Sequence, residues 1–194
     1  MMKYSYKILL LFLFSVSLSA QTKNEKESRI QLSEFPENAQ ILIQPIISDV
    51  RRIRHYKEID GKYVSFESKF KYKKYWYSVE FSRLGILEDI EVEIKERNLE
   101  SIISKTINLY LKESFIKYDI IKIQEQYVAD SSTEDTSFLK SVLENRNVIN
   151  SNYELIIAVK SSEDWELKEM TFGPKGEFLS SRNIQQGSYE YILY

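Results

Sequence analysis

Side chains able to do chemistry are few in this sequence, and most of them are carboxylates. The chain has one histidine, His55, and no cysteine, so thiol catalysis, disulfides and a cysteine–histidine pair are excluded. No nucleophile-elbow motif accompanies His55, histidine-rich metal sites are absent, and the five glycines form no phosphate-binding loop. The sequence therefore predicts a protein that is not an enzyme, with no cofactor and no nucleotide site.

Acidic residues gather at one place, where Glu88, Asp89, Glu91 and Glu93 follow one another closely. Asp89, Glu91 and Glu93 share one face of a predicted strand, which is the arrangement that paired catalytic carboxylates or a hard-cation site would need. The strand lacks the looped oxygen ligands of a calcium site, and charge on the wet face of a sheet needs no special cause. We interpret these residues as a solvated acidic stripe and predict no metal site.

A recognition surface is predicted around Trp76, on the polar face of the same sheet. If Tyr72 pairs with Tyr75, Lys71 lies opposite Trp76, and a four-residue connection brings Glu91 to its other side. A large aromatic ring with charged neighbours is typical of a binding hot spot. The alternative is that a helix or the C-terminal segment covers Trp76, which would make it core. The predicted binding residues are Trp76, Lys71, Lys69, Glu91 and Tyr63.

The strands that must position these residues are predicted to form an antiparallel meander. Residues 63–72, 75–82 and 86–94 alternate apolar and polar side chains with the period of a half-buried strand, with Ile86 inward and Leu87 outward. Turns are predicted at Lys73-Lys74 and before Gly85, which can adopt positive φ. A shift of one residue would send one strand's apolar set into water, so the pattern fixes the register.

Helices and a second set of strands flank this meander. Helical spacing follows Pro36 and covers residues 99–111, and the Phe81-to-Gly85 spacing recurs between Phe172 and Gly176. These patterns predict an α+β fold, an antiparallel sheet with helices packed on one face, built as two tandem helix-plus-meander repeats. The predicted divisions are a flexible leader (21–34), a first repeat (35–97) and a second repeat (98–194) with an insertion at about 129–150.

The chain begins with the pattern of a secretory signal peptide. Lys3 and Lys7 precede an apolar run over residues 8–16, and small residues lead to a predicted cleavage site before Gln21. The alternative, an uncleaved anchor, is disfavoured by the short apolar run. We therefore predict a periplasmic or secreted protein that is not an integral membrane protein after cleavage. The formal charge of −2 predicts no nucleic-acid partner.

The segment YWYSVEFSRLGILEDIEVEI, its echo YELIIAVKSSEDWELKEMTFGPKGEFLSSRNI and the leading FPENAQ resemble the PepSY-like, β-lactamase-inhibitor-protein-like domains of exported Bacteroidetes-type proteins. The resemblance covers residues 35–184 and implies a helix-on-sheet module that binds or inhibits proteins. It implies no catalytic residue. The basic segment 51–57 and the insertion depart from the pattern and leave the partner open.

These observations lead to one main hypothesis and two alternatives. The main hypothesis is an exported, non-enzymatic binding module of the cell envelope, inhibitor-like in the sense of the resemblance. It would recognise an unknown envelope or extracellular protein through an exposed sheet face. The alternatives are a glycan-binding module that uses exposed aromatic rings such as Trp76 and a hydrolase that depends on surface carboxylates.

Overall fold

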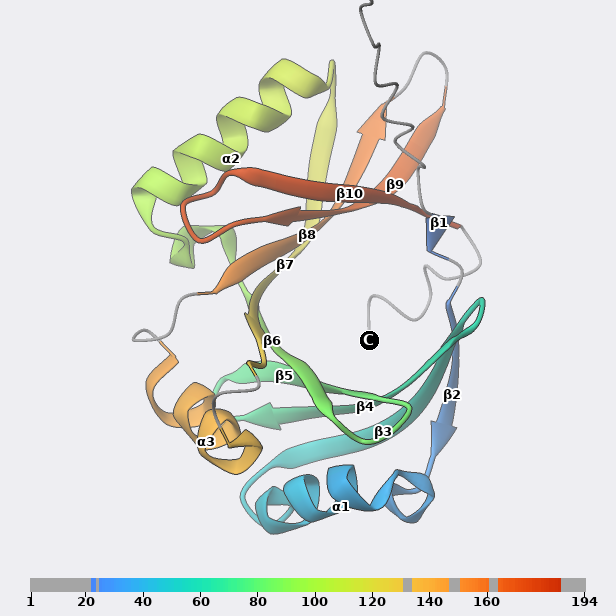
Figure 1. Cartoon of the computed structure of the whole chain (residues 1–194). Coiled ribbons are helices and arrows are strands. Elements are labelled where there is room, and N and C mark those ends of the chain that lie inside the picture. The colour runs from blue at the N-terminus through green and yellow to red at the C-terminus, as the bar shows by residue number, and fades with distance from the viewer. Residues whose placement is uncertain (1–21, 24, 131–133, 147–150, 161–163, 186–194) are drawn as a thin grey trace, which may run out of the picture.

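The computed structural model describes residues 22–23, 25–130, 134–146, 151–160 and 164–185, so the predicted signal peptide lies outside the described residues. One curved sheet of ten strands runs through the molecule in the order β1-β10-β9-β8-β7-β6-β5-β4-β3-β2 (Figure 1). Neighbours from β2 to β10 pair antiparallel, and β1 adds to β10 in parallel. The strands are β1 (Thr22–Lys23), β2 (Glu25–Ile30), β3 (Arg51–Asp60), β4 (Tyr63–Tyr72), β5 (Tyr75–Ser82), β6 (Leu87–Ile94), β7 (Tyr118–Val128), β8 (Asn152–Lys160), β9 (Trp165–Phe172) and β10 (Phe178–Ile184).

Helices cover the convex side of this sheet and leave the concave side open (Figure 1). They are α1 (Glu37–Ile43), α2 (Ser101–Ser114) and α3 (Asp135–Asn145), with short 3-10 turns at Leu32–Glu34, Gln44–Ile46 and Glu96–Asn98. Each α-helix buries one apolar stripe, which for α2 is Ile103, Ile107 and Leu111. Two apolar clusters result, one under α1 and α3 against β3–β6 and one under α2 against β7–β9.

The central register of the meander is confirmed. Tyr72 pairs with Tyr75 and Lys71 with Trp76, around a turn in which Lys73 takes a φ of 51°. Gly85 turns the next hairpin with a φ of 76°, and an added Cβ there would approach the Pro36 side chain to 2.7 Å. This glycine therefore allows both the turn and the close approach of the hairpin to the start of α1.

One detail of the next strand was predicted wrongly. The register shifts between Glu80 and Phe81, so Phe81 pairs with Leu87. Leu87 is buried at 3% exposure whereas Ile86 is 56% exposed, the reverse of the predicted alternation. A bulge adds a residue to one strand, and this exchanges the faces of the residues beyond it.

The predicted fold class is also wrong, because the protein is mostly sheet and the two-repeat description does not hold. β6 pairs antiparallel with β7, so one ladder of hydrogen bonds continues through the predicted boundary between residues 97 and 98. The segment expected to be an insertion in a second repeat contains α3, whose Leu139 and Val142 are buried in the cluster of β3–β6. Glycine turns recur at Gly85 and Gly176, but a shared turn type does not create separate repeat units.

The segment predicted as a flexible leader is ordered as strand over residues 22–23 and 25–30. β2 pairs with β3, and β1 pairs with β10, so consecutive pieces of chain bond to opposite ends of the sheet (Figure 1). Strand pairing uses backbone groups, so a polar segment with few apolar residues can occupy a sheet edge. The N-terminal strands therefore draw the two ends of the curved sheet together.

Candidate functional site

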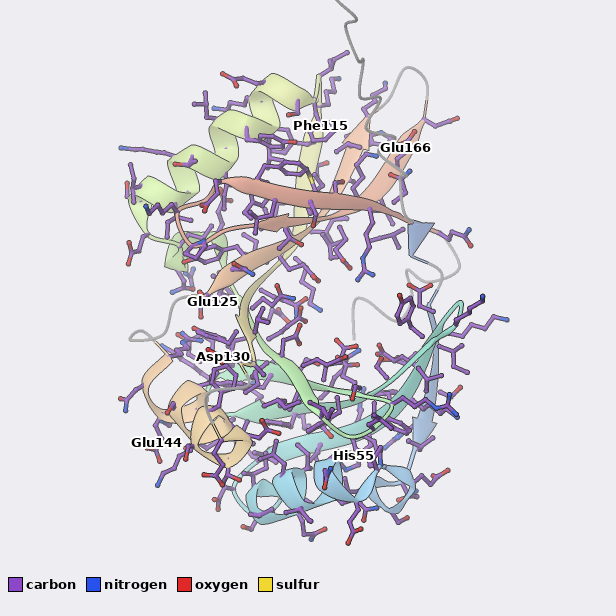
Figure 2. All side chains as sticks on the ribbon, in the orientation of Figure 1. His55, Phe115, Glu125, Asp130, Glu144 and Glu166 are labelled. Carbon is purple, nitrogen blue, oxygen red and sulfur yellow. The ribbon has the colours of Figure 1, made fainter. Side chains whose placement is uncertain are left out.

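The concave side of the sheet encloses a space of about 660 Å³, which we call the hollow. Side chains from the strands fill much of the region inside the curve (Figure 2). Nine acidic and five basic residues line the hollow, so its lining is both polar and net negative. The acidic residues are Glu27, Glu58, Asp60, Glu67, Glu80, Glu88, Asp89, Glu91 and Glu154, and the basic ones are Lys62, Lys69, Arg83, Lys122 and Arg182.

A first charged group, here the Lys69 cluster, consists of Glu27, Glu58, Glu67, Lys69 and Ser78. The Lys69 Nζ lies 2.7 Å from Glu27 Oε1 and 2.9 Å from Glu67 Oε2. Ser78 donates a hydrogen bond to the other oxygen of Glu67. The strand pairings β2–β3, β3–β4 and β4–β5 bring these side chains to one face of the sheet.

The pKa values in the Lys69 cluster follow from burial and charge. Burial alone would raise the pKa of Glu67, but attraction to Lys69, a side-chain hydrogen bond with Glu58 and one donated by Ser78 lower it to about 2. Burial would lower the pKa of Lys69, yet Glu67 and Glu27 raise it above its usual range. Burial raises the pKa of Glu27 in spite of Lys69, because one ammonium cannot fully compensate several carboxylates.

A second group, here the Asp89 cluster, consists of Glu80, Asp89, Glu91 and Gln126. Asp89 Oδ2 accepts a hydrogen bond of 2.9 Å from Gln126 Nε2, and Glu91 Oε2 accepts one of 2.5 Å from Gln124 Nε2. Burial raises the pKa of Asp89 well above the usual aspartate value, and repulsion from Glu91 and Glu80 raises it further. The prediction of a solvated stripe is therefore wrong for Asp89, while Glu88 and Glu93 are exposed.

Four of the five predicted binding residues line the hollow or a smaller neighbouring pocket, and Lys71 lines neither. Trp76 is half-buried and lines a pocket of about 130 Å³ together with Tyr56, Lys69 and Glu93. Lys71 lies opposite Trp76, but the bulge places Glu91 opposite Ser78, so the predicted contact of Glu91 with Trp76 is wrong. Glu91 and Tyr63 line the hollow, and Tyr63 is 83% exposed. The proposed recognition role of all five residues stays a prediction.

Sequence reasoning missed the buried polar residues of the concave face. Five of them come from β4, β5, β7, β8 and β9 and are each less than about a tenth exposed: Glu67, Ser78, Gln124, Glu154 and Glu169. Glu169 on β9 accepts a hydrogen bond from Arg182 on β10. The available signal was that polar side chains alternate with apolar ones on strand after strand, but only the curvature of the sheet turns such a face into an interior lining.

Two further arrangements contain residue types that are also found in catalytic or metal-binding sites. His55 Nδ1 lies 2.9 Å from Ser68 Oγ, but Ser68 is fully buried and the His55 ring packs edge-on against Phe35, near α1 (Figure 2). Oxygen atoms of Glu27, Glu58 and Glu67 lie within 4.8 Å of one another, which is close enough to surround a cation. The ammonium of Lys69 already provides that cation.

Comparisons with known proteins identify the fold class. No known family and no curated protein sequence matches the chain. A DUF2874 family protein of Bacteroides ovatus has a similar structure, with a TM-score of 0.50 and 11% identity over 77% of this chain and 87% of that chain. The similarity shows that the two chains share a fold.

Two further solved structures are less similar. A BLIP-like protein of Bacteroides fragilis has a TM-score of 0.46 and 11% identity, over 77% of this chain and 86% of that chain. A protein of Bacteroides eggerthii that is described as periplasmic has a TM-score of 0.48 and 14% identity, over 77% of this chain and 88% of that chain. The resemblance read from the sequence, in both its β-lactamase-inhibitor-protein-like and its PepSY-like parts, stays a prediction.

The periplasmic or secreted location stays a prediction from the sequence, because a shared fold does not determine where a protein resides. Among the described residues, no helix combines the length and the apolar character that crossing a bilayer requires.

Proposed function

We propose that the protein is a non-enzymatic binding module of the cell envelope and that its hollow receives a segment of a protein partner. The observation that carries this proposal is the difference between the two sides of the sheet. The convex side is covered by α1, α2 and α3 and is apolar, while the concave side holds a polar space of about 660 Å³. A concave surface with converging polar groups is the usual form of a binding site.

The placement of His55 supports a function without catalysis. His55 is the one histidine of the chain, and the hydroxyl group beside it belongs to Ser68. Ser68 has no exposed surface, so its hydroxyl cannot reach a substrate. The charged residues of the hollow are instead joined to one another in ion pairs and hydrogen bonds. Such a lining is suited to recognising complementary charge.

A pair of tryptophan substitutions tests which side of the sheet binds. Ser65 lines the hollow, so Ser65→Trp should obstruct it and abolish capture of envelope proteins by the purified mature chain. Ser141, exposed on α3, is the matched control, and Ser141→Trp should leave capture unchanged. Loss of capture with Ser141→Trp alone would place recognition on the convex side and contradict the proposal.

Glycan binding at Trp76 is the second candidate function. The pocket of about 130 Å³ that Trp76 shares with Tyr56 offers two aromatic side chains among charged ones, a composition that suits stacking on a sugar ring. Trp76→Ala should then abolish binding of envelope glycans and lower the melting temperature little. If Trp76 is core, the same substitution should lower the free energy of unfolding by about 3 to 5 kcal/mol.

A further inference from the structure

The Asp89 cluster contains a buried carboxylate oxygen without a hydrogen-bond donor. Asp89 lies on β6, opposite Glu80 of β5, and Glu91 follows it on the same face of the strand. Gln126 donates a hydrogen bond to Oδ2 of Asp89, but Oδ1 is buried and has no hydrogen-bond partner. A buried acceptor that is left unsatisfied destabilises the fold, and a buried carboxylate does so more strongly than a neutral group.

Buried carboxylates at two other places on the concave face have a cation beside them. Lys69 pairs with Glu67 and Glu27 in the Lys69 cluster, and Arg182 pairs with Glu169. Within the part of the chain that the structure describes, no lysine or arginine forms an ion pair with Asp89. Lys62, Arg83 and Lys122 also line the hollow, yet none of them reaches this carboxylate within ion-pair distance.

The arrangement favours an organic cation over a metal ion. In the described residues, the acidic oxygens that converge closely enough for a metal belong to Glu27, Glu58 and Glu67, and the Asp89 cluster is not among them. Glu80, Asp89 and Glu91 all line the hollow, so they can present acceptors to a group that enters it. An ammonium has three donors and a guanidinium has five, which suits several separated carboxylates.

We propose that the Asp89 cluster binds a lysine or arginine side chain of the protein partner, whose cationic head enters the hollow and pairs with Asp89 between Glu80 and Glu91. This inference rests on the proposed function, because the cation belongs to the segment that the hollow receives. The net negative lining of the hollow, with nine acidic and five basic residues, would draw such a segment inward. The partner's cation takes the place at Asp89 that Lys69 takes at Glu67.

Calorimetry with a defined probe tests the inference. The probe is an acetylated and amidated tri-lysine peptide, and the matched neutral probe is the corresponding tri-glutamine peptide. The mature chain should bind the first and not the second. Asp89→Asn should weaken tri-lysine binding by about thirtyfold or more, as expected when one partner of a buried charge pair is removed. Asp119→Asn, the same change at an exposed position of β7, should leave it unchanged.

A measurement on the unmodified chain covers the case in which Asp89→Asn fails to fold. The Asp89 carboxyl carbon is followed by NMR through a pH titration, with and without the tri-lysine peptide. A bound cation stabilises the ionised carboxylate, so the peptide should lower the pKa of Asp89. An unchanged titration of Asp89 in the presence of bound peptide would overturn the inference.

The remaining outcomes separate this inference from the proposed function. If Asp89→Asn binds tri-lysine as tightly as the unmodified chain, the inference is overturned. It is also overturned if the unmodified chain binds calcium but no peptide, and Asp89→Asn no longer binds calcium. If Ser65→Trp abolishes capture of a partner and Asp89→Asn does not, the hollow is a binding site and the cation assignment is wrong. If neither substitution affects capture, the proposed function itself fails.

Discussion

The Lys69 cluster and the Asp89 cluster lie on the same face of the same sheet, with Lys69 and Asp89 two strands apart. The pKa values of their carboxyl groups are shifted in opposite directions. In the Lys69 cluster the pKa of Glu67 is lowered to about 2, whereas in the Asp89 cluster the pKa of Asp89 is raised well above its usual value. Burial acts to raise the pKa of both carboxyl groups, so burial does not explain the difference. The difference follows from the cation: among the described residues, Lys69 pairs with Glu67, whereas no lysine or arginine pairs with Asp89.

The comparison separates two uses of a buried charge. A carboxylate paired with an internal cation contributes to holding the strands in register, and removing its partner leaves an uncompensated charge. A carboxylate without such a cation lowers stability at neutral pH, and this loss is recovered when a ligand supplies the cation. The two clusters can therefore be distinguished by stability measurements alone.

The largest effect is expected from Lys69→Met. The substitution keeps most of the side-chain length but leaves Glu27 and Glu67 without their ammonium partner in a buried position. The free energy of unfolding in urea should fall by about 3 to 5 kcal/mol. Lys71→Met, on the same strand and face, is the control and should change it by about 0.5 kcal/mol at most. Equal effects of the two substitutions would show that the Lys69 cluster does not stabilise the fold.

A smaller loss is expected from Ser78→Ala. The Ser78 hydroxyl donates to the buried carboxylate of Glu67, and hydrogen bonds to charged groups contribute more than neutral ones. Unfolding in urea should show a loss of about 1.5 to 3 kcal/mol. Ser65→Ala, two residues from Glu67 along β4 and partly exposed, should have little effect. A neutral result for Ser78→Ala would mean that Lys69 and Glu58 set the low pKa of Glu67 without Ser78.

Asp89→Asn should have the opposite sign and stabilise the unliganded protein. Asparagine keeps an acceptor for Gln126 and removes a charge that is repelled by Glu80 and Glu91. At a pH above the raised pKa of Asp89, the free energy of unfolding should rise by on the order of 1 kcal/mol. Thermal unfolding with the Asp119→Asn control measures this. A destabilised Asp89→Asn protein would show that the charge of Asp89 is already compensated.

The two clusters should also differ in the pH dependence of stability, an effect that is small at any one pH. The pKa of Glu67 is lowered in the folded state, so its contribution is present above the unfolded pKa and is lost as pH falls toward about 2. The pKa of Asp89 is raised, so its ionisation reduces stability as pH rises from the usual aspartate value through the folded one. Unfolding in urea, measured across pH, tests both expectations. In Glu67→Gln the free energy of unfolding should fall less steeply as the pH is lowered toward about 2. In Asp89→Asn it should no longer fall as the pH rises above the usual aspartate pKa.

Local patterns in the sequence were sufficient for the register of β4 with β5, for the turns of the meander and for the buried face of α2. The pairings of Tyr72 with Tyr75 and Lys71 with Trp76 follow from period-two alternation, since any other register would expose apolar rings to water. Apolar residues at helical spacing identify Ile103 and Ile107 as part of the buried stripe of α2. Gly85 could be placed in its turn because positive φ is a local requirement.

Only the tertiary structure decided what the polar face does. Because of the bulge after Glu80, Glu91 lies opposite Ser78 and not beside Trp76. No local sequence pattern predicts which residue of a strand stays unpaired in a bulge. The pairing of β1 and β2 with opposite ends of the sheet depends on backbone hydrogen bonds, which carry no side-chain signature. The resulting curvature is what buries Glu67 and Asp89. Whether a carboxylate on a strand is solvated or interior depends on strands distant in the sequence, so the sequence determined the polar face and the fold made it a candidate site.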